Sequence, residues 1–94
     1  MKIYQSRSFE KKVKKMSKPE KEFLDREIKS IADDSQIGEG KKGDLRRIFI
    51  HKFKLKTLNY LLAYRKAGED LELIMIGPHE NYYRDLKRYL KNLV

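Results

Sequence analysis

The second half of the sequence contains a stretch in which apolar and charged residues alternate. In residues 45–55, LRRIFIHKFKL, Leu45, Phe49, Phe53 and Leu55 occupy odd positions with several charges between them. This period of two is typical of a strand that buries one face. It restricts the fold strongly, because a sheet with one apolar face needs helices to cover that face.

Two more strands are expected in residues 58–66, LNYLLAYRK, and residues 71–76, LELIMI. Residues 67–70, AGED, join them as a hairpin, so the three strands form an antiparallel meander. A short strand at residues 2–5 can join this sheet.

The first predicted helix has Phe9, Val13 and Met16 at positions i, i+4 and i+7, and Ser6 or Ser8 is available to cap it. Such spacing places the three apolar side chains on one helix face.

A second helix, from about residue 18 to 33, follows Ser17, which has the Ser-x-x-Glu capping-box spacing to Glu20. It folds back on the first as a helical hairpin. Residues 34–43, rich in glycine, indicate a loop. After residue 78 a C-terminal helix is expected from four apolar residues stepping by four, three and four: Tyr82, Leu86, Tyr89 and Leu93.

The predicted element order is therefore β-α-α-β-β-β-α. We expect an α+β fold in which an antiparallel sheet of about four strands packs against the helical hairpin, with a C-terminal helix. The sequence shows no repeat or long linker, so residues 1–94 are expected to form a single domain.

The composition restricts the chemistry and the partners. The chain has 94 residues, no cysteine, two histidines and a formal net charge of +9. Without cysteine there is no disulfide framework, no thiolate nucleophile and no Cys-ligated zinc, so we expect metal-free chemistry without a cofactor. No apolar run is long enough to span a bilayer, and we expect a cytoplasmic protein with no membrane partner.

The positive charge is concentrated between residues 41 and 56, where seven cations face one acid, a net charge of +6. The cations are Lys41, Lys42, Arg46, Arg47, Lys52, Lys54 and Lys56. Because aromatic residues are interleaved with them, the stretch has the components of an RNA-binding surface. The alternative is a charged, solvated face that prevents sheet aggregation.

Both histidines are candidate proton-transfer groups, since imidazole titrates near neutral pH. By alternation His51 should face the apolar side of its strand, where it could be an ordinary half-buried core residue. His79 follows Gly77-Pro78 at a strand end and opens a helix; it is either a site residue or a simple helix-start residue.

RNA supplies its own nucleophile, the 2′-hydroxyl, so cleavage needs a base, cations for the phosphorane charge and an acid for the leaving oxygen. Further residues could serve in such a site, namely Asn59, Tyr60, Arg65, Tyr82, Tyr83 and Arg84. Tyr82 fits the apolar stripe and is assigned to the core, whereas Tyr83 lies off that stripe and is the better candidate for stacking or proton transfer.

The segments DLRRIFIHKF, LLAYRK and IGPHENYYRDLKRYL, in this order and layout, resemble the RelE/ParE toxins of bacterial type II toxin-antitoxin modules over nearly the whole chain. The most specific segment, LIMIGPHENYYRDLKRYL, is similar to the ParE-like and YafQ-like branches, in which a histidine after a Gly-x pair contributes to the RNase site. His79 takes that place. Tyr83 lies at the position where related toxins carry an aromatic residue that supports cleavage.

The resemblance implies further roles by position on the strands. His51 lies on the strand that carries another functional histidine in some relatives. The family's phosphate-binding cations correspond to Arg47, Lys52 and Lys54, and Asn59 corresponds to a polar site residue.

The resemblance also implies an activity: ribosome-dependent cleavage of mRNA at codons in the A site, with the ribosome, mRNA and a cognate antitoxin as partners and no cofactor. Our leading hypothesis is a translation-inhibiting endoribonuclease. In it His79 is general acid or base, His51 is a second proton-transfer group, and the phosphate is bound by Arg46, Arg47, Lys52, Lys54, Asn59, Arg65 and Arg84. The rival hypotheses are a ParE-like, non-enzymatic inhibitor of DNA gyrase and a nucleic-acid-binding module without toxicity.

Overall fold

The computed structural model describes residues 2–34, 39–40 and 48–91. In chain order the elements are β1 (Ile3–Gln5), α1 (Arg7–Lys14), α2 (Lys18–Asp33), β2 (Glu39–Gly40), β3 (Phe49–Leu55), β4 (Leu58–Ala67), β5 (Asp70–Pro78) and α3 (Tyr82–Lys91). The predicted α+β class and element order are confirmed. One element is added, because the two-residue β2 lies within the segment expected to be loop.

The strands form one sheet in the order β1-β5-β4-β3-β2. β3, β4 and β5 make the predicted antiparallel meander. The prediction of an antiparallel sheet was wrong at its edge, because β1 pairs in parallel with β5, with Ile3 opposite Leu71 and Gln5 opposite Leu73. The meander leaves one edge of β5 open, and α1, which follows β1 after only Ser6, packs against β5. The sheet is therefore mixed.

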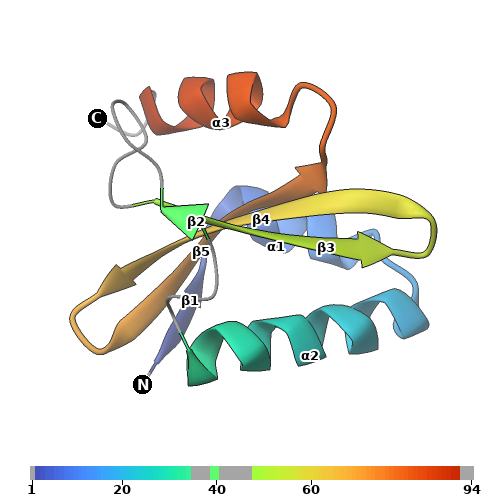
Figure 1. The fold of residues 1–94 in the computed structure, drawn as a ribbon, viewed down its shortest axis with the longest axis horizontal. Helices are drawn as coiled ribbons and strands as arrows, with labels where there is room; N and C mark the ends of the chain where they lie inside the picture. The colour runs from blue at the N-terminus through green and yellow to red at the C-terminus, as the bar shows by residue number, and fades with distance from the viewer. Residues whose placement is uncertain (1, 35–38, 41–47, 92–94) are drawn as a thin grey trace.

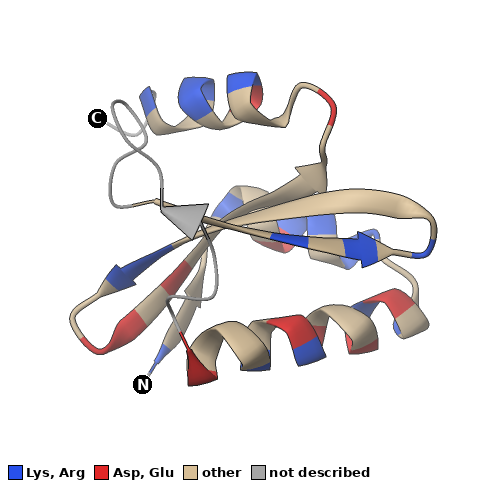
Figure 2. Cartoon of the chain, viewed as in Figure 1, with Lys and Arg blue, Asp and Glu red and all other residues tan. Residues whose placement is uncertain are grey.

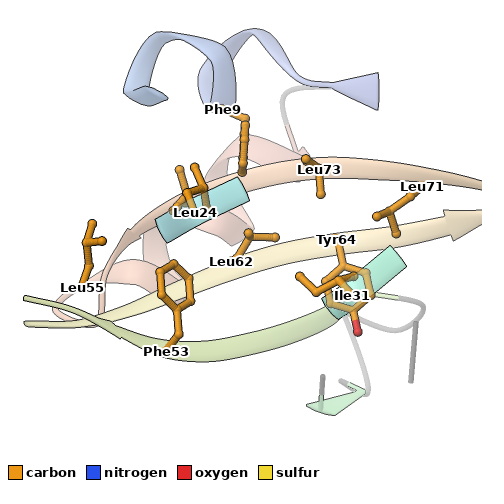
Figure 3. Close-up of a cluster of buried hydrophobic side chains, with 10 residues drawn as sticks. Phe9, Leu24, Ile31, Phe53, Leu55, Leu62, Tyr64, Leu71 and Leu73 are labelled. Carbon is orange, nitrogen blue, oxygen red and sulfur yellow. The ribbon is translucent and has the colours of Figure 1, made fainter. Parts of the chain in front are cut away.

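The helices α1 and α2 cover one face of the sheet. Their apolar stripes meet the side chains of β3, β4 and β5 that point to that face (Figure 3). The buried residues of this core are Phe9, Leu24, Ile31, Phe53, Leu55, Leu62, Tyr64, Leu71, Leu73 and Ile76. This is the face that the alternation in residues 45–55 predicted to be apolar.

The helix α3 covers the opposite face, so the sheet lies between α2 and α3 (Figure 1). The buried residues on this side are Ile48, Ile50, Leu61, Ala63, Ile74, Tyr82 and Leu86. The expectation that helices cover one face was thus incomplete. The central strand β4 is buried on both faces over residues 61–64, a continuous apolar run that alternation does not reveal.

Local signals set the helix starts. The Ser6 side chain accepts a hydrogen bond from the Phe9 amide at 3.0 Å, and Ser17 and Glu20 form the predicted capping box. Within the described parts of the chain no helix is long and apolar enough to cross a membrane.

Candidate active site

Three residues, two from the β3–β4 hairpin and one that follows β5, lie in a row across the sheet face that α3 covers. Lys54 is directly opposite Asn59, and the backbone amide of His79 donates to the carbonyl oxygen of Asn59 at 3.1 Å. Directly opposite residues of paired strands project to the same face. Leu61 and Ala63, which share the parity of Asn59 on β4, pack under α3 and so identify that face.

The imidazole of His79 meets the ring of Tyr83 on α3. The ring centroids are 6.2 Å apart and the planes meet at 83°, an edge-to-face arrangement. His79 is exposed, whereas Tyr83 is half-buried. Lys52 projects beside Lys54 on the same face of β3, one pleat further along. We call these five residues, Lys52, Lys54, Asn59, His79 and Tyr83, the His79 surface.

The position of this surface depends on Tyr82, which is buried against the sheet. Its hydroxyl accepts a hydrogen bond from the Ala63 amide at 2.9 Å and donates one to the Met75 carbonyl at 2.6 Å. The two strands have a register shift between Ala63 and Tyr64, so the hydroxyl bridges β4 and β5 at a β-bulge. The Tyr82 ring lies over Gly77, where an added Cβ would be 3.6 Å from it.

Burial raises the pKa of the Tyr82 phenol far above its usual value. The phenol therefore stays protonated at neutral pH and serves as an anchor. Assignment of Tyr82 to the core is confirmed by its 2% exposure, but the sequence did not reveal its role between the strands.

Asn81 is a residue that the sequence reasoning missed. It adopts a φ of 59°, and its carbonyl accepts a hydrogen bond from the Asp85 amide at 3.1 Å, so it begins α3. Asparagine tolerates this left-handed conformation better than most residues, a signal that could have located the turn. The turn brings His79 and Tyr83 together.

The structure separates His51 from His79. His51 points to the face covered by α1 and α2, as its strand parity predicted, and its Nε2 lies 3.3 Å from a Glu27 carboxylate oxygen on α2. Its ring stacks on Phe53 with centroids 5.8 Å apart. The sheet lies between the two imidazoles, so they do not share a site.

Arg65 is on β4 but far from the His79 surface. It forms an ion pair with Glu72 at 2.6 Å, opposite it on β5. It is six positions along β4 from Asn59, a distance of about 20 Å along the strand. Arg65 therefore belongs to the other end of this face.

Arg84 follows Tyr83 on α3 and is exposed, with its Nε 3.6 Å from the neighbouring Asp85 carboxylate. Arg46 and Arg47, the other predicted phosphate-binding residues, lie outside the described residues. Across the described ranges no group of three His, Asp or Glu side chains is placed to hold a metal ion.

The comparison with protein families identifies the chain. The model of the ParE-like toxins of type II bacterial toxin-antitoxin systems matches residues 3–87. The chain belongs to this family. A comparison of the sequence with curated proteins gives no match.

Solved structures of RelE share the fold of this ParE-like toxin. A mutant of Escherichia coli RelE in the free state has a TM-score of 0.70 at 17% identity, covering 99% of this chain and 97% of its own. Isolated E. coli RelE has a TM-score of 0.64 at 21% identity, and the match covers 93% of this chain and 96% of the RelE chain. A chain of the intact E. coli RelBE toxin-antitoxin complex has a TM-score of 0.66 at 20% identity, and the match covers 84% of this chain and 96% of that chain.

Proposed function

We propose that this ParE-like toxin inhibits translation by cleaving mRNA on the ribosome, with His79 as the proton-transfer group. The observation that supports this is the His79 surface, where an exposed imidazole lies in line with Asn59 and Lys54 and against the Tyr83 ring. These residues come from β3, β4, the turn after β5 and the start of α3. Their side chains supply a general acid or base, a cation and a stacking ring together.

The chemistry needs no group beyond RNA and these side chains. The 2′-hydroxyl loses its proton and its oxygen forms a bond to the adjacent phosphorus, while the bond from phosphorus to the 5′-oxygen breaks. The leaving 5′-oxygen takes up a proton, which gives a 2′,3′-cyclic phosphate and a 5′-hydroxyl. An imidazole near neutral pH can exchange either proton. In this proposal Lys52 and Lys54 balance the negative charge on the phosphorane.

Two parts of the earlier hypothesis change in this proposal. His51 is left out, because it lies on the opposite face of the sheet against Glu27. Arg65 is left out of the cleavage step, because Glu72 holds it at the far end of the face. The proposed site therefore contains one imidazole.

The partners follow from the family and from charge. A toxin of a type II toxin-antitoxin system is expected to have a cognate antitoxin. We expect that antitoxin to place acidic or amphipathic residues over the basic surface. The ribosome and its mRNA are the proposed target.

The test is primer extension on an mRNA translated in a purified system, with wild-type protein and His79→Gln. We expect cuts at codon spacing that require ribosomes. General acid-base groups contribute about 100-fold to 10,000-fold to a rate, so His79→Gln should slow cleavage by at least about 100-fold.

His51→Gln is the matched control, because it replaces the other imidazole with the same amide. We expect it to cleave like the wild type. Equal losses in both variants would refute the assignment to His79. Intact mRNA together with trapped gyrase-DNA complexes would replace the proposal with gyrase inhibition.

A further inference from the structure

A second concentration of positive charge lies outside the His79 surface, on α1. A hollow of about 400 Å³ is lined by Arg7, Ser8, Lys11, Lys12, Lys15 and Tyr89. The first five residues belong to α1 and its C-terminal cap, whereas Tyr89 comes from α3 on the other side of the sheet. We call this feature the α1–Tyr89 hollow.

The cations follow the helix geometry. Arg7, Lys11 and Lys15 are four residues apart, so they form one ridge with successive side chains about 6 Å apart along the axis. All three are exposed, and Lys12 lies on the adjacent ridge. The described lining contains no acidic residue; Glu10 borders the next depression along the helix.

This hollow is separate from the proposed catalytic residues. Tyr89 is six residues beyond Tyr83 on α3, about 9 Å further along the helix. The α1 cations belong to a helix that packs against β5, next to the edge strand β1, whereas the His79 surface extends across β4 to β3. A single ligand group cannot occupy both places.

The chemistry of the lining favours RNA over a protein partner. Four cations, a hydroxyl and one half-buried ring offer contacts to phosphates, sugar hydroxyls and a base. A protein interface normally has an apolar, poorly charged centre, and Tyr89 alone does not provide one. Interfaces with nucleic acid are polar and positively charged.

Positive charge is also distributed unevenly among the helices. Basic residues follow α1 and α3, whereas α2 alternates between acidic and basic residues (Figure 2). The helix α3 adds Lys87, Arg88 and Lys91 around a depression of about 670 Å³. A polyanion is therefore attracted to α1 and α3 in preference to α2.

We propose that the α1–Tyr89 hollow binds the phosphodiester backbone of RNA at a place distinct from the strand that is cut. The choice of RNA as the polyanion rests on the proposed function. The hollow anchors the toxin to structured RNA, while the His79 surface engages the scissile strand. Binding at the hollow requires no chemistry at His79.

The experiment measures binding of a fluorescently labelled RNA hairpin by anisotropy over a series of salt concentrations. Every protein carries His79→Gln, so the RNA stays intact. The test variant adds Arg7→Gln, Lys11→Gln and Lys15→Gln. We expect at least a 10-fold weaker Kd, and a salt dependence that falls by the release of about two to three counterions.

The matched control adds Lys18→Gln, Lys21→Gln and Lys29→Gln instead, which remove the same charge from exposed positions of α2. We expect its Kd to change by less than about 3-fold, since long-range attraction alone is lost. Equal weakening in the two variants would overturn the proposal, because net charge would then explain binding. Circular dichroism verifies that both variants fold.

A polyglutamate peptide identifies the class of ligand. If it binds the wild-type hollow as tightly as RNA does, and the α1 substitutions remove that binding, the occupant is an acidic polypeptide and the proposal is wrong. Failure of the proposed function gives a different result: RNA binding depends on the hollow, but the protein with His79 intact does not cut translated mRNA.

Discussion

The hydroxyl of Tyr82 takes the place of a backbone partner where β4 and β5 lose their regular register. It satisfies the buried amide of Ala63 and the carbonyl of Met75, and the ring above Gly77 fixes the first turn of α3. An unpaired buried amide is costly, so this single oxygen stabilises both the bulge and the helix start.

Replacing Tyr82 with phenylalanine keeps the ring but removes the hydroxyl. We expect the free energy of unfolding to fall by about 1–3 kcal/mol, because the Ala63 amide loses its acceptor while remaining buried. Urea denaturation followed by circular dichroism measures the change.

Tyr89→Phe is the control on the same helix, since the Tyr89 ring is only half-buried. Its effect should stay within about 0.5 kcal/mol, as for most substitutions near the surface. A stability of Tyr82→Phe equal to that of the wild type would show that the hydroxyl is dispensable.

Single residues of the site were predictable to different degrees. Strand parity located His51 on the apolar side, because alternation is a local property. The sequence predicted that His79 and Tyr83 belong to one site, but it did not predict the contact between their rings. The bridge made by Tyr82 was not predictable, because the bulge beneath it depends on how two strands align.

Among the elements, α2 begins with a capping box whose two hydrogen bonds are both formed. The Ser17 amide donates to the Glu20 carboxylate at 2.9 Å, and the Glu20 amide donates to the Ser17 hydroxyl. These bonds to Ser17 hold the pKa of Glu20 below its usual value. The ionised carboxylate is therefore the form that stabilises the helix start.

Substituting each of the two capping-box side chains should change the stability in a different way. Ser17→Ala should lower the free energy of unfolding by about 1 kcal/mol. Glu20→Gln should lower stability at neutral pH, but the difference from wild type should disappear as pH falls through the depressed pKa of Glu20. Urea denaturation at a series of pH values from neutral to acidic measures both effects. A difference that grows on acidification would contradict this role of the carboxylate.

The elements differ in how well sequence alone predicted them. The bounds of α2, Lys18–Asp33, agree with the expectation because the cap, the proline and the apolar spacing are all local signals. The strands of the meander were also found from alternation and turns. The direction of β1 was not predicted, because residues 2–5 contain nothing that specifies whether their partner strand runs parallel.

The whole molecule carries a net charge of +9, and the basic residues outnumber the acidic ones on α1, α3 and β3. Such an excess of one sign opposes compaction through self-repulsion. Salt weakens that repulsion over distances beyond the Debye length. Stability should therefore depend on ionic strength.

We expect the thermal midpoint to rise when sodium chloride increases from about 10 mM to about 150 mM, which shortens the Debye length from about 30 Å to about 8 Å. The variant with Arg7, Lys11 and Lys15 all changed to Gln should show a smaller rise, because it carries less net charge. Differential scanning calorimetry measures both. A midpoint that falls with salt would mean that attractive ion pairs outweigh the repulsion.

The pairing of β1 with β5 also bears on how the chain is made. Ile3–Gln5 leave the synthesising ribosome before their partners Leu71–Leu73, which are translated much later in the chain. The first helix also rests on β5, so a large part of its docking surface is missing until then. The β1 edge of this toxin is thus completed only once β5 has been made, and a nascent chain that has not yet released β5 lacks the finished sheet edge.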